Sequence, residues 1–425
     1  MATDAIIAAP ARAPGLLEQG SFLAFLALAF VGLSPFSPPS PLVAQYGGVA
    51  MTGAGDTARQ LCYLAVLGAV ALGALRQQGA AAFGALPWLL LALLTWCAAS
   101  ALWSPEPLVT VRRAGLAFVL VVAAVLSVEA VGTDKALRLW RWVLLAILIV
   151  NFVSIKFIPT AVHLPGEADA QLVGDWRGLY GHKNIAGSVG AITALVFLFS
   201  PAESWRRKAF DVLVAAAAIA FTVMTRSKSS LGLVGVAILA GGVYRLAWRR
   251  EIDRTIAVVA AAVLLIVAAV FVVADRNAIA GLFSDPQEFT GRTEIWRAEA
   301  AFIADHPLLG AGFGTFSNTG GVSPLHNYVG NWVTEASHGH NGYLQLLVTV
   351  GGVGFVLALA ALVAAPAVAL WRRGGARTKA LLFALFVFLL LHNLMETDFL
   401  EGDGVTWVAY LLMLTMVYRF DRAES

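Results

Sequence analysis

The sequence has 425 residues, of which 59% are hydrophobic and only 13% are charged. Soluble globular domains carry about 25% charged residues, so this composition excludes an ordinary soluble protein. The formal net charge of +3 is too small to identify a partner by itself. Cys62 and Cys97 both fall in apolar runs, and they therefore indicate neither a disulfide framework nor a metal cluster.

Apolar runs that approach or reach the ~20 residues needed to cross hydrocarbon recur along the chain. Lipid offers no hydrogen-bond partner to backbone groups, so these runs must be helices. We therefore predict an all-α polytopic membrane protein with about twelve transmembrane helices. A cleaved signal peptide is not expected, because only Arg12 is basic before the first span. The predicted spans lie near 15–34, 57–75, 83–102, 108–130, 137–158, 184–200, 208–225, 228–246, 253–274, 341–365, 378–396 and 403–419.

The orientation follows from the lysines and arginines, most of which fall in alternate connections. Connections rich in these residues stay in the cytoplasm. We therefore expect a bacterial inner-membrane protein with both termini in the cytoplasm. The long connections near 35–56, 159–183 and 275–340 then face the periplasm.

This topology divides the chain into three parts. Residues 1–274 hold nine predicted helices, 275–340 form a periplasmic subdomain, and 341–425 hold three helices and a cytoplasmic tail. Within the subdomain, 291–305 has the spacing of an amphipathic helix that ends at His306-Pro307. Its apolar stripe consists of Ile295, Trp296, Ala300, Phe302 and Ile303.

Cations stand where several helices are predicted to begin at the periplasmic face. They occur at Arg59, at Arg112-Arg113, in Gly181–Asn184, in Arg226–Ser229 and at His340-Asn341. A cation at a helix N-terminus opposes the macrodipole, at a cost of about 0.3–1 kcal/mol each. Helix N-termini bind phosphate well, so we expect a polyanion, such as a diphosphate, among these cations. The alternative is that single cations such as Arg59 extend to lipid headgroups.

His340 is the candidate base. The positive end of a helix favours neutral imidazole, which accepts a proton from a hydroxyl. Glu396 is expected at the membrane edge, either paired with a periplasmic arginine or in a solvated acidic loop. The glycine-rich run 310–314 follows no predicted strand, which argues against a nucleotide site. A metal site is disfavoured because its candidate ligands have irregular spacing. Those ligands are His326, Glu335, His338 and His340.

Five motifs in the second half of the chain resemble those of the O-antigen ligase and exopolysaccharide polymerase family. Each motif is weak alone, but their order is specific. Gly-His-Lys-Asn is more similar to the exopolysaccharide polymerase branch. The motifs are Arg177–Asn184, Thr225–Ser230, Gly291–Trp296, His306–Gly314 and His340–Leu346.

The resemblance implies an inverting, metal-independent glycosyltransferase at the periplasmic face, with an undecaprenyl-diphosphate-linked oligosaccharide as donor. It implies that His340 acts as base and that Arg292 holds the diphosphate. The family motif has Ser-Arg where this chain has Ser227-Lys228, so either Lys228 or Arg226 takes the second phosphate position. Further candidate diphosphate ligands are Arg177, His182 and Lys183, and the supporting residues are Asn184, Asn341 and Glu396.

The acceptor distinguishes the remaining hypotheses. A polymerase extends a lipid-linked repeat unit, a ligase transfers glycan to lipid A core, and a related transferase glycosylates protein. No cofactor and no nucleic acid are expected; the partners are donor, glycan acceptor, membrane lipid and candidate chain-length or export proteins. From another class, a secondary transporter or flippase of an anionic solute would place charge at the bilayer midplane, which this sequence lacks.

Overall fold

The computed structural model describes residues 13–37, 56–167, 170–201, 204–249, 292–317, 319–330, 339–372 and 377–423. In these ranges the regular structure is helical, apart from an isolated antiparallel bridge between Val162 and Trp176. The predicted all-α class is therefore confirmed for the described residues. The long helices are α1 (Leu16–Phe30), α3 (Thr57–Gln78), α4 (Trp88–Ala99), α5 (Pro107–Val131), α6 (Thr133–Phe157), α7 (Lys183–Phe199), α8 (Trp205–Met224), α9 (Lys228–Arg249), α12 (Arg292–Asp305), α13 (Gly342–Ala358), α14 (Ala365–Arg372), α15 (Arg377–His392) and α16 (Val405–Ala423).

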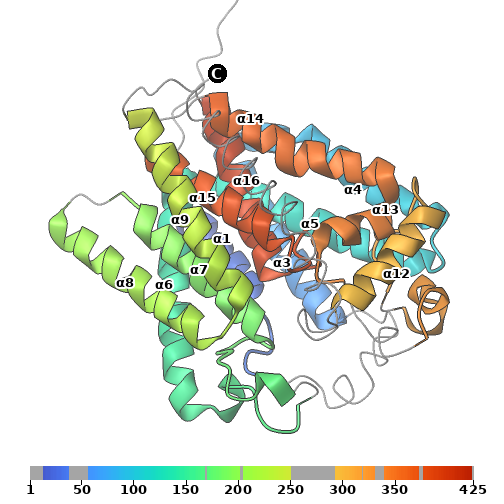
Figure 1. The fold of residues 1–425 in the computed structure, drawn as a ribbon. Coiled ribbons are helices and arrows are strands. Elements are labelled where there is room, and N and C mark those ends of the chain that lie inside the picture. Colours follow the sequence, from blue (N-terminus) through green and yellow to red (C-terminus); the bar gives the residue numbers. More distant parts are fainter. Residues whose placement is uncertain are drawn as a thin grey trace, which may run out of the picture.

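Short helical turns join these helices (Figure 1). Every predicted span coincides with a helix or a run of helices, except 253–274, which lies outside the described residues. Five runs are long and apolar enough to cross a membrane: Thr57–Ala85, Pro107–Val131, Thr133–Phe157, Lys228–Trp248 and Gly342–Trp371. The total number of crossings, the periplasmic loop and the division at 274 and 340 stay predictions. The turns are η1 (Gly79–Ala85), η2 (Ser100–Leu102), η3 (Pro159–Ala161), η4 (Ala170–Leu172), η5 (Gly320–Val322), η6 (Pro324–Asn327) and the π-helical η8 (Leu359–Ala364).

Two predicted boundaries are wrong. The tenth predicted span continues beyond 365, because α13, η8 and α14 form one apolar run from Gly342 to Trp371. The eleventh ends earlier, at His392, because the Asn393 side chain accepts hydrogen bonds from two later backbone N–H groups and turns the chain. Glu396 therefore lies in the connection between α15 and α16.

The predicted amphipathic helix 291–305 is confirmed as α12, but one residue, Ala300, was wrongly assigned to its buried apolar stripe. Ile295, Ala298 and Phe302 are buried, whereas Ala300 is exposed. These buried residues follow the three- and four-residue spacing of a helix face, which Ala300 does not share. Glu299 is buried on the same face.

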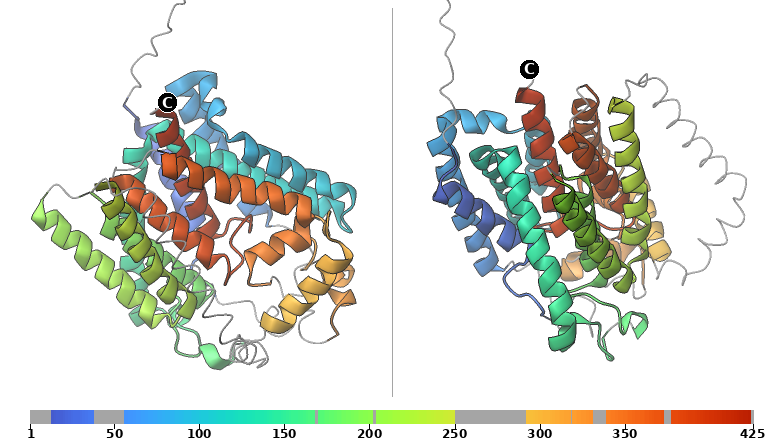
Figure 2. Two further views of the ribbon diagram at one scale, coloured as in Figure 1. Left: turned by 45° about the horizontal axis from the view of Figure 1, so that its top comes forward. Right: turned by 90° about the vertical axis from the view of Figure 1, so that its left-hand side faces the viewer.

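The core of the bundle is formed by helices that are apolar around their whole circumference. The second half of α5, most of α7 and the middle of α16 are buried, as expected for such helices. The outer helices instead expose large apolar side chains; Leu61 on α3 is 60% exposed and Leu239 on α9 is 71% exposed. Helix α8 lies at the edge of the bundle, opposite α12 and α13 (Figures 1 and 2). Apolar faces of this extent are typical of lipid contact.

The glycine-rich segment 306–314 packs into a break in α13. Gly351 has φ +66° inside that helix, and its neighbours bond to the segment instead of to the helix. Ala311 N donates to Val348 O at 2.8 Å, and Gly352 N donates to Pro307 O at the same distance. A Cβ on Gly351 would lie 2.2 Å from Leu308 O, so the close approach requires glycine. The motif therefore has a packing role that fixes the middle of α13 against the segment after α12.

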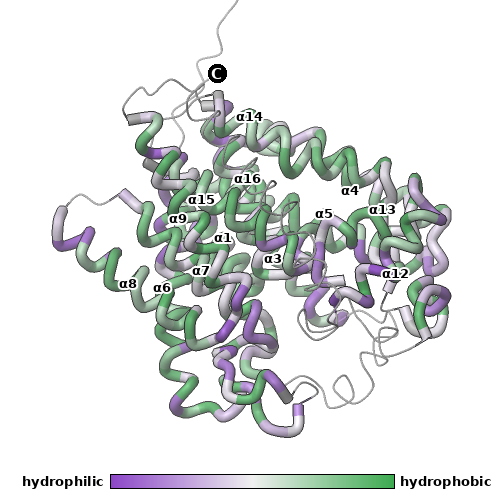
Figure 3. Tube along the Cα trace, in the orientation of Figure 1, coloured by the Kyte–Doolittle hydropathy of each residue, from purple (hydrophilic) through white to green (hydrophobic). Residues whose placement is uncertain are grey.

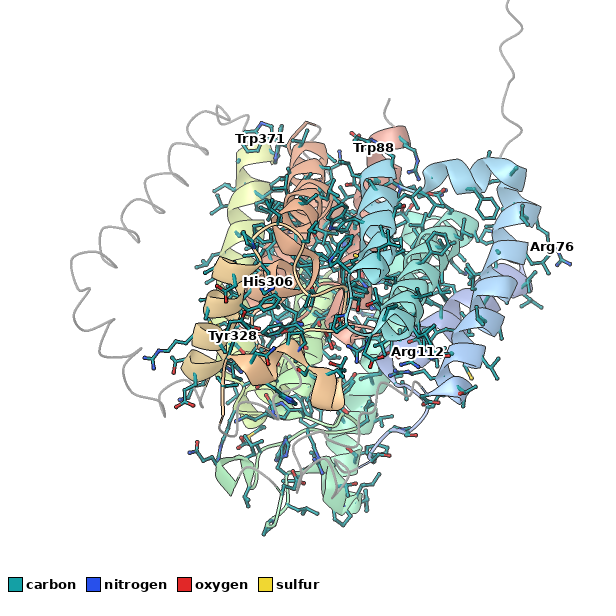
Figure 4. All side chains as sticks on the ribbon, turned by 90° about the vertical axis from the view of Figure 1, so that its right-hand side faces the viewer. Arg76, Trp88, Arg112, His306, Tyr328 and Trp371 are labelled. Atoms are coloured by element: carbon teal, nitrogen blue, oxygen red, sulfur yellow. The ribbon has the colours of Figure 1, made fainter. Side chains whose placement is uncertain are left out.

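The two ends of the bundle differ in polarity. Hydrophilic positions gather at the lower end in Figure 3 and around α12. At the other end, the buried Glu129 of α5 forms ion pairs with Arg419 and Arg422 of α16. Figure 4 shows Trp88 and Trp371 near that upper end, and both are exposed. Exposed tryptophans near a helix end are typical of a membrane interface.

Candidate functional site

Glu396 joins three of the predicted site residues. Its Oε1 atom accepts from Arg292 Nη2 at 2.8 Å and from Asn184 Nδ2 at 2.7 Å. Its Oε2 atom lies 3.0 Å from His340 Nδ1. Arg292 begins α12, Asn184 lies in the first turn of α7, and His340 precedes α13. Segments far apart in the sequence therefore converge on one carboxylate, and we call these four residues the Glu396 cluster.

The segment that carries His340 is held by the start of α13. Asn341 caps the helix, because its side chain accepts from Tyr343 N and Leu344 N at 3.1 Å each. Gly342 N donates to Asn393 O at 2.8 Å and to Glu396 O at 3.1 Å. His340 itself has φ +51°, a left-handed conformation that costs energy in a residue with a side chain. Its backbone is therefore fixed by cap and glycine contacts, as a positioned functional group requires.

A hydrogen bond and a neighbouring positive charge keep Glu396 ionised despite its burial. Burial alone disfavours the carboxylate, but the hydrogen bond from His340 and the charge of Arg292 hold the pKa of Glu396 well below its usual range. A carboxylate only accepts hydrogen bonds, so the bonded Nδ1 of His340 carries the proton. The lone pair of the neutral ring is then on Nε2. The geometry thus orients His340 as a proton acceptor.

A second carboxylate, Asp175, joins two more predicted cations. Lys183 Nζ lies 2.6 Å from Asp175 Oδ2, and Arg226 Nη1 lies 3.1 Å from Asp175 Oδ1. Asp175 is 1% exposed, whereas the Arg226 side chain is 70% exposed. Arg226 also has φ +51°, which fits the tight turn between α8 and α9. We call these three residues the Asp175 cluster.

The first turn of α7 connects the two clusters. Lys183 contacts Asp175, and the next residue, Asn184, contacts Glu396. His182 caps the helix through Nδ1, which accepts from Asn184 N at 3.2 Å. Burial lowers the pKa of His182 to about 4 despite the attraction of Glu396, so this imidazole is neutral near pH 7. His182 therefore acts in the structure as a cap rather than as a cation.

Arg177 and Lys228 occupy opposite environments. Arg177 is fully buried and bonds to Thr160 O at 2.7 Å and to the Glu167 carboxylate at 3.0 Å. These bonds hold the connection before α7 in place, so Arg177 could contact a phosphate only if its bonds to Thr160 and Glu167 were broken. Lys228, the first residue of α9, is exposed. The diphosphate roles of Arg177, Lys228, Arg226, His182 and Lys183 stay predictions.

The protein supplies part of the negative charge expected among the cations at the helix starts. Its own carboxylates pair with several of these cations, and the predicted external anion stays a prediction. Arg59 pairs with Asp403 at 3.1 Å, and the two clusters neutralise Lys183 and Arg292. The sequence analysis overlooked Asp175 and Glu167, although both lie in the predicted connection 159–183. Counting the acidic residues of the same connections would have indicated them.

The sequence analysis also missed a buried chain of polar groups beside the Glu396 cluster. His392 Nδ1 lies 2.7 Å from Asp398 Oδ2, and His392 Nε2 lies 3.4 Å from Ser230 Oγ. Thr406 Oγ1 donates to the other oxygen of Asp398 at 2.6 Å. These bonds tie the starts of α9 and α16 to the end of α15. No local pattern predicts the contact with Ser230, because Ser230 and His392 are 162 positions apart in the sequence.

Within the described ranges, no group of three His, Cys, Asp or Glu residues is placed to hold a metal ion. Of the candidates considered above, His326 and His340 are described. Glu335 and His338 lie outside the described residues. A metal-free reaction therefore stays an expectation.

These observations define a helical membrane protein with two clusters of polar residues, the Glu396 cluster and the Asp175 cluster, at one end of its bundle. The family model for O-antigen ligase matches residues 212–359, which include Arg226, Lys228, Arg292 and His340. This match to about a third of the chain supports membership of the O-antigen ligase and polymerase family. No curated protein matches the chain significantly.

Proposed function

We propose that this protein is a glycosyltransferase that polymerises polysaccharide at the periplasmic face of the inner membrane. The donor is an oligosaccharide linked to undecaprenyl diphosphate, and the acceptor is a sugar hydroxyl of another repeat unit. The observation that carries the proposal is the convergence of Arg292, His340 and Asn184 on Glu396. The guanidinium of Arg292 can stabilise a leaving diphosphate, and the oriented His340 can accept the proton of an attacking hydroxyl. Both groups are needed when a hydroxyl attacks a carbon that bears a diphosphate.

The reaction is a single displacement. The acceptor hydroxyl gives its proton to His340 Nε2 as its oxygen forms a bond to the anomeric carbon. The bond from that carbon to the diphosphate oxygen breaks, and the leaving polyprenyl diphosphate keeps the electron pair. Attack opposite the leaving group inverts the configuration.

The exposed and the buried cations have different parts in this proposal. Arg226 and Lys228 expose their charges, so they contact the diphosphate from the open side. The Arg292 side chain is 14% exposed and already holds Glu396, so it both positions the base and meets the leaving group. Charges fixed by carboxylates before the substrate arrives need no reorganisation during the reaction.

A second candidate differs only in the acceptor. The family model carries the description O-antigen ligase, which favours transfer of glycan to lipid A core. The resemblance of Gly181–Asn184 to the polymerase branch favours chain elongation instead. Protein glycosylation requires the same donor chemistry.

The test uses purified protein in vesicles with polyprenyl-diphosphate repeat units from the producing organism. Polymerisation predicts a ladder of lipid-linked products with increasing numbers of repeat units, and the ladder should persist in EDTA. A ligase yields no ladder but modifies added lipid A core. Absence of both products would overturn the proposal, and a strict requirement for a divalent cation would contradict its metal-free mechanism.

A further inference from the structure

We propose that the cavity beside Glu396 binds one sugar residue of the glycan substrate, either neutral or amino-substituted, through its hydroxyl groups. This inference rests on the proposed function, since it names a subsite for the same substrate. It rests on Tyr180, which precedes α7, and on Thr397, in the connection between α15 and α16, neither of which the transfer mechanism uses. The resemblance to the family motifs does not include that connection.

The cavity has a volume of about 520 Å³. It lies among the end of α1, the start of α7 and the connection that leads into α16. Ligand pockets typically have volumes of about 300–1,000 Å³, so there is room for a sugar ring. Glu396 and Asn184 line it and also belong to the Glu396 cluster. A sugar in the cavity would therefore lie next to the group that orients His340.

Two hydroxyl groups of lining residues lack a hydrogen-bond partner within the described part of the chain. Tyr180 is 6% exposed and Thr397 is 8% exposed. Neither Tyr180 OH nor Thr397 Oγ1 has a hydrogen-bond partner among the residues that the structure describes. Buried polar groups are almost always paired, because an unmade hydrogen bond costs free energy. Both residues line one cavity, so a single polyhydroxylated ligand could supply both partners.

The charges of the wall exclude a phosphate as the occupant. Glu396, Asp398 and Asp403 line the cavity, and their cationic partners there are His392 and Arg59. A wall this rich in carboxylates repels a diphosphate but accepts hydrogen bonds from sugar hydroxyls or an amino group. The apolar end of α1, from Leu28 to Phe30, and the next residue, Val31, also line the cavity. This apolar part of the wall packs against the C–H face of a sugar ring.

The experiment measures saccharide binding without turnover. The probe is the lipid-free repeat-unit oligosaccharide released from the producer's own polysaccharide. It is titrated into detergent-purified His340→Ala protein, with Tyr180→Phe, Thr397→Val or both added. Neither substitution breaks an internal hydrogen bond among the described residues. We expect about fivefold weaker binding for each hydroxyl removed and more than tenfold weaker binding for the double variant.

The matched control is Tyr244→Phe, which removes a tyrosine hydroxyl that donates to Leu370 O at 2.8 Å, away from the cavity. Its saccharide affinity should equal that of the parent. Unchanged affinity in the double variant, or no detectable binding by the parent, would overturn the inference.

Kinetic measurements on protein that retains His340 separate this inference from the proposed function. If the cavity holds the acceptor, Tyr180→Phe raises the KM for lipid-free acceptor; if it holds donor sugar, the KM for the lipid-linked donor rises instead. Weakened saccharide binding in a protein that shows no transfer would support the cavity and overturn the proposed function. Normal transfer by Tyr180→Phe with both KM values unchanged would support the proposed function and overturn the sugar-binding cavity.

Discussion

Glu396 accepts a hydrogen bond from His340 Nδ1 at 3.0 Å while its other carboxylate oxygen binds Arg292 Nη2 at 2.8 Å. One side chain thus fixes the tautomer of the proposed base and the position of the proposed phosphate ligand. The two functions depend on each other, because a shift of Glu396 would move both partners.

Glu396→Gln should lower the rate of glycan transfer about 100-fold, within the range of general base catalysis. The NH2 group of the amide would face either the Nδ1–H of His340 or the donors of Arg292 and Asn184, so at least one hydrogen bond is lost. The measurement is the initial rate per folded molecule. The control is Glu129→Gln, which disrupts a buried carboxylate paired with Arg419 and Arg422 at the other end. This control should lower stability but not the rate; a Glu396→Gln rate above half of wild type would contradict the role.

Arg292→Lys should reduce transfer at least tenfold. Arg292 contacts both Glu396 and the backbone carbonyl of Met395, and the single ammonium of lysine lacks the forked geometry for both. Arg297→Lys is the control, since Arg297 is exposed on the same helix. Initial rates of both variants are compared at saturating donor. Equal rates for the two would mean that only the positive charge at 292 matters.

Gly342→Ala should damage the site without changing any polar group. A Cβ at this position would lie 2.0 Å from Asn393 Oδ1, so the start of α13 or the α15–α16 connection must move. Overpacking of this kind costs about 1–3 kcal/mol. Thermal unfolding and initial rate should both fall. Gly232→Ala on α9, where the added Cβ meets nothing within 4 Å, should keep wild-type activity. A fully active Gly342→Ala variant would show that the site tolerates displacement.

Glu299 should make stability depend on pH. Burial raises the pKa of Glu299 to about 8 in the folded state. In the unfolded state its pKa is the ordinary glutamate value of about 4.3. The folded state therefore retains a proton that the unfolded state has lost, and stability falls as pH rises from about 4.3 to 8. Glu299→Gln should raise the apparent melting temperature at pH 8 more than at pH 5. Asp305→Asn, at the exposed end of the same helix, should keep the wild-type profile. Identical profiles for Glu299→Gln and wild type would contradict the buried acid.

Much of the fold follows from local sequence. Spans were predicted correctly as helices in the described part because lipid forces apolar runs into that conformation. The packing of 306–314 into the break at Gly351 could not be predicted, because it depends on contacts between two distant segments. The early end of α15 likewise follows from Asn393 bonding to residues after it.

The residues of the Glu396 cluster were among the predicted site residues, but most of their mutual hydrogen bonds and ion pairs were not predicted. The motifs indicated His340, Arg292 and Asn184, and the structure brings these three together. The sequence suggested an arginine partner for Glu396 but could not show that it would also bind His340 and Asn184. Asp175 was missed because a carboxylate that pairs with Lys183 and Arg226 follows no local spacing. Long-range ion pairs depend on topology, which composition and periodicity do not define.

The central claim is that His340 removes the acceptor proton at a site organised by Glu396. The most direct measurement compares wild type and His340→Ala in the reconstituted elongation assay, with binding of the lipid-linked donor measured in parallel. We predict that His340→Ala binds donor normally and produces no elongated glycan above background. Elongation by this variant at more than about a tenth of the wild-type rate would contradict the claim, since loss of a general base costs roughly 100-fold or more.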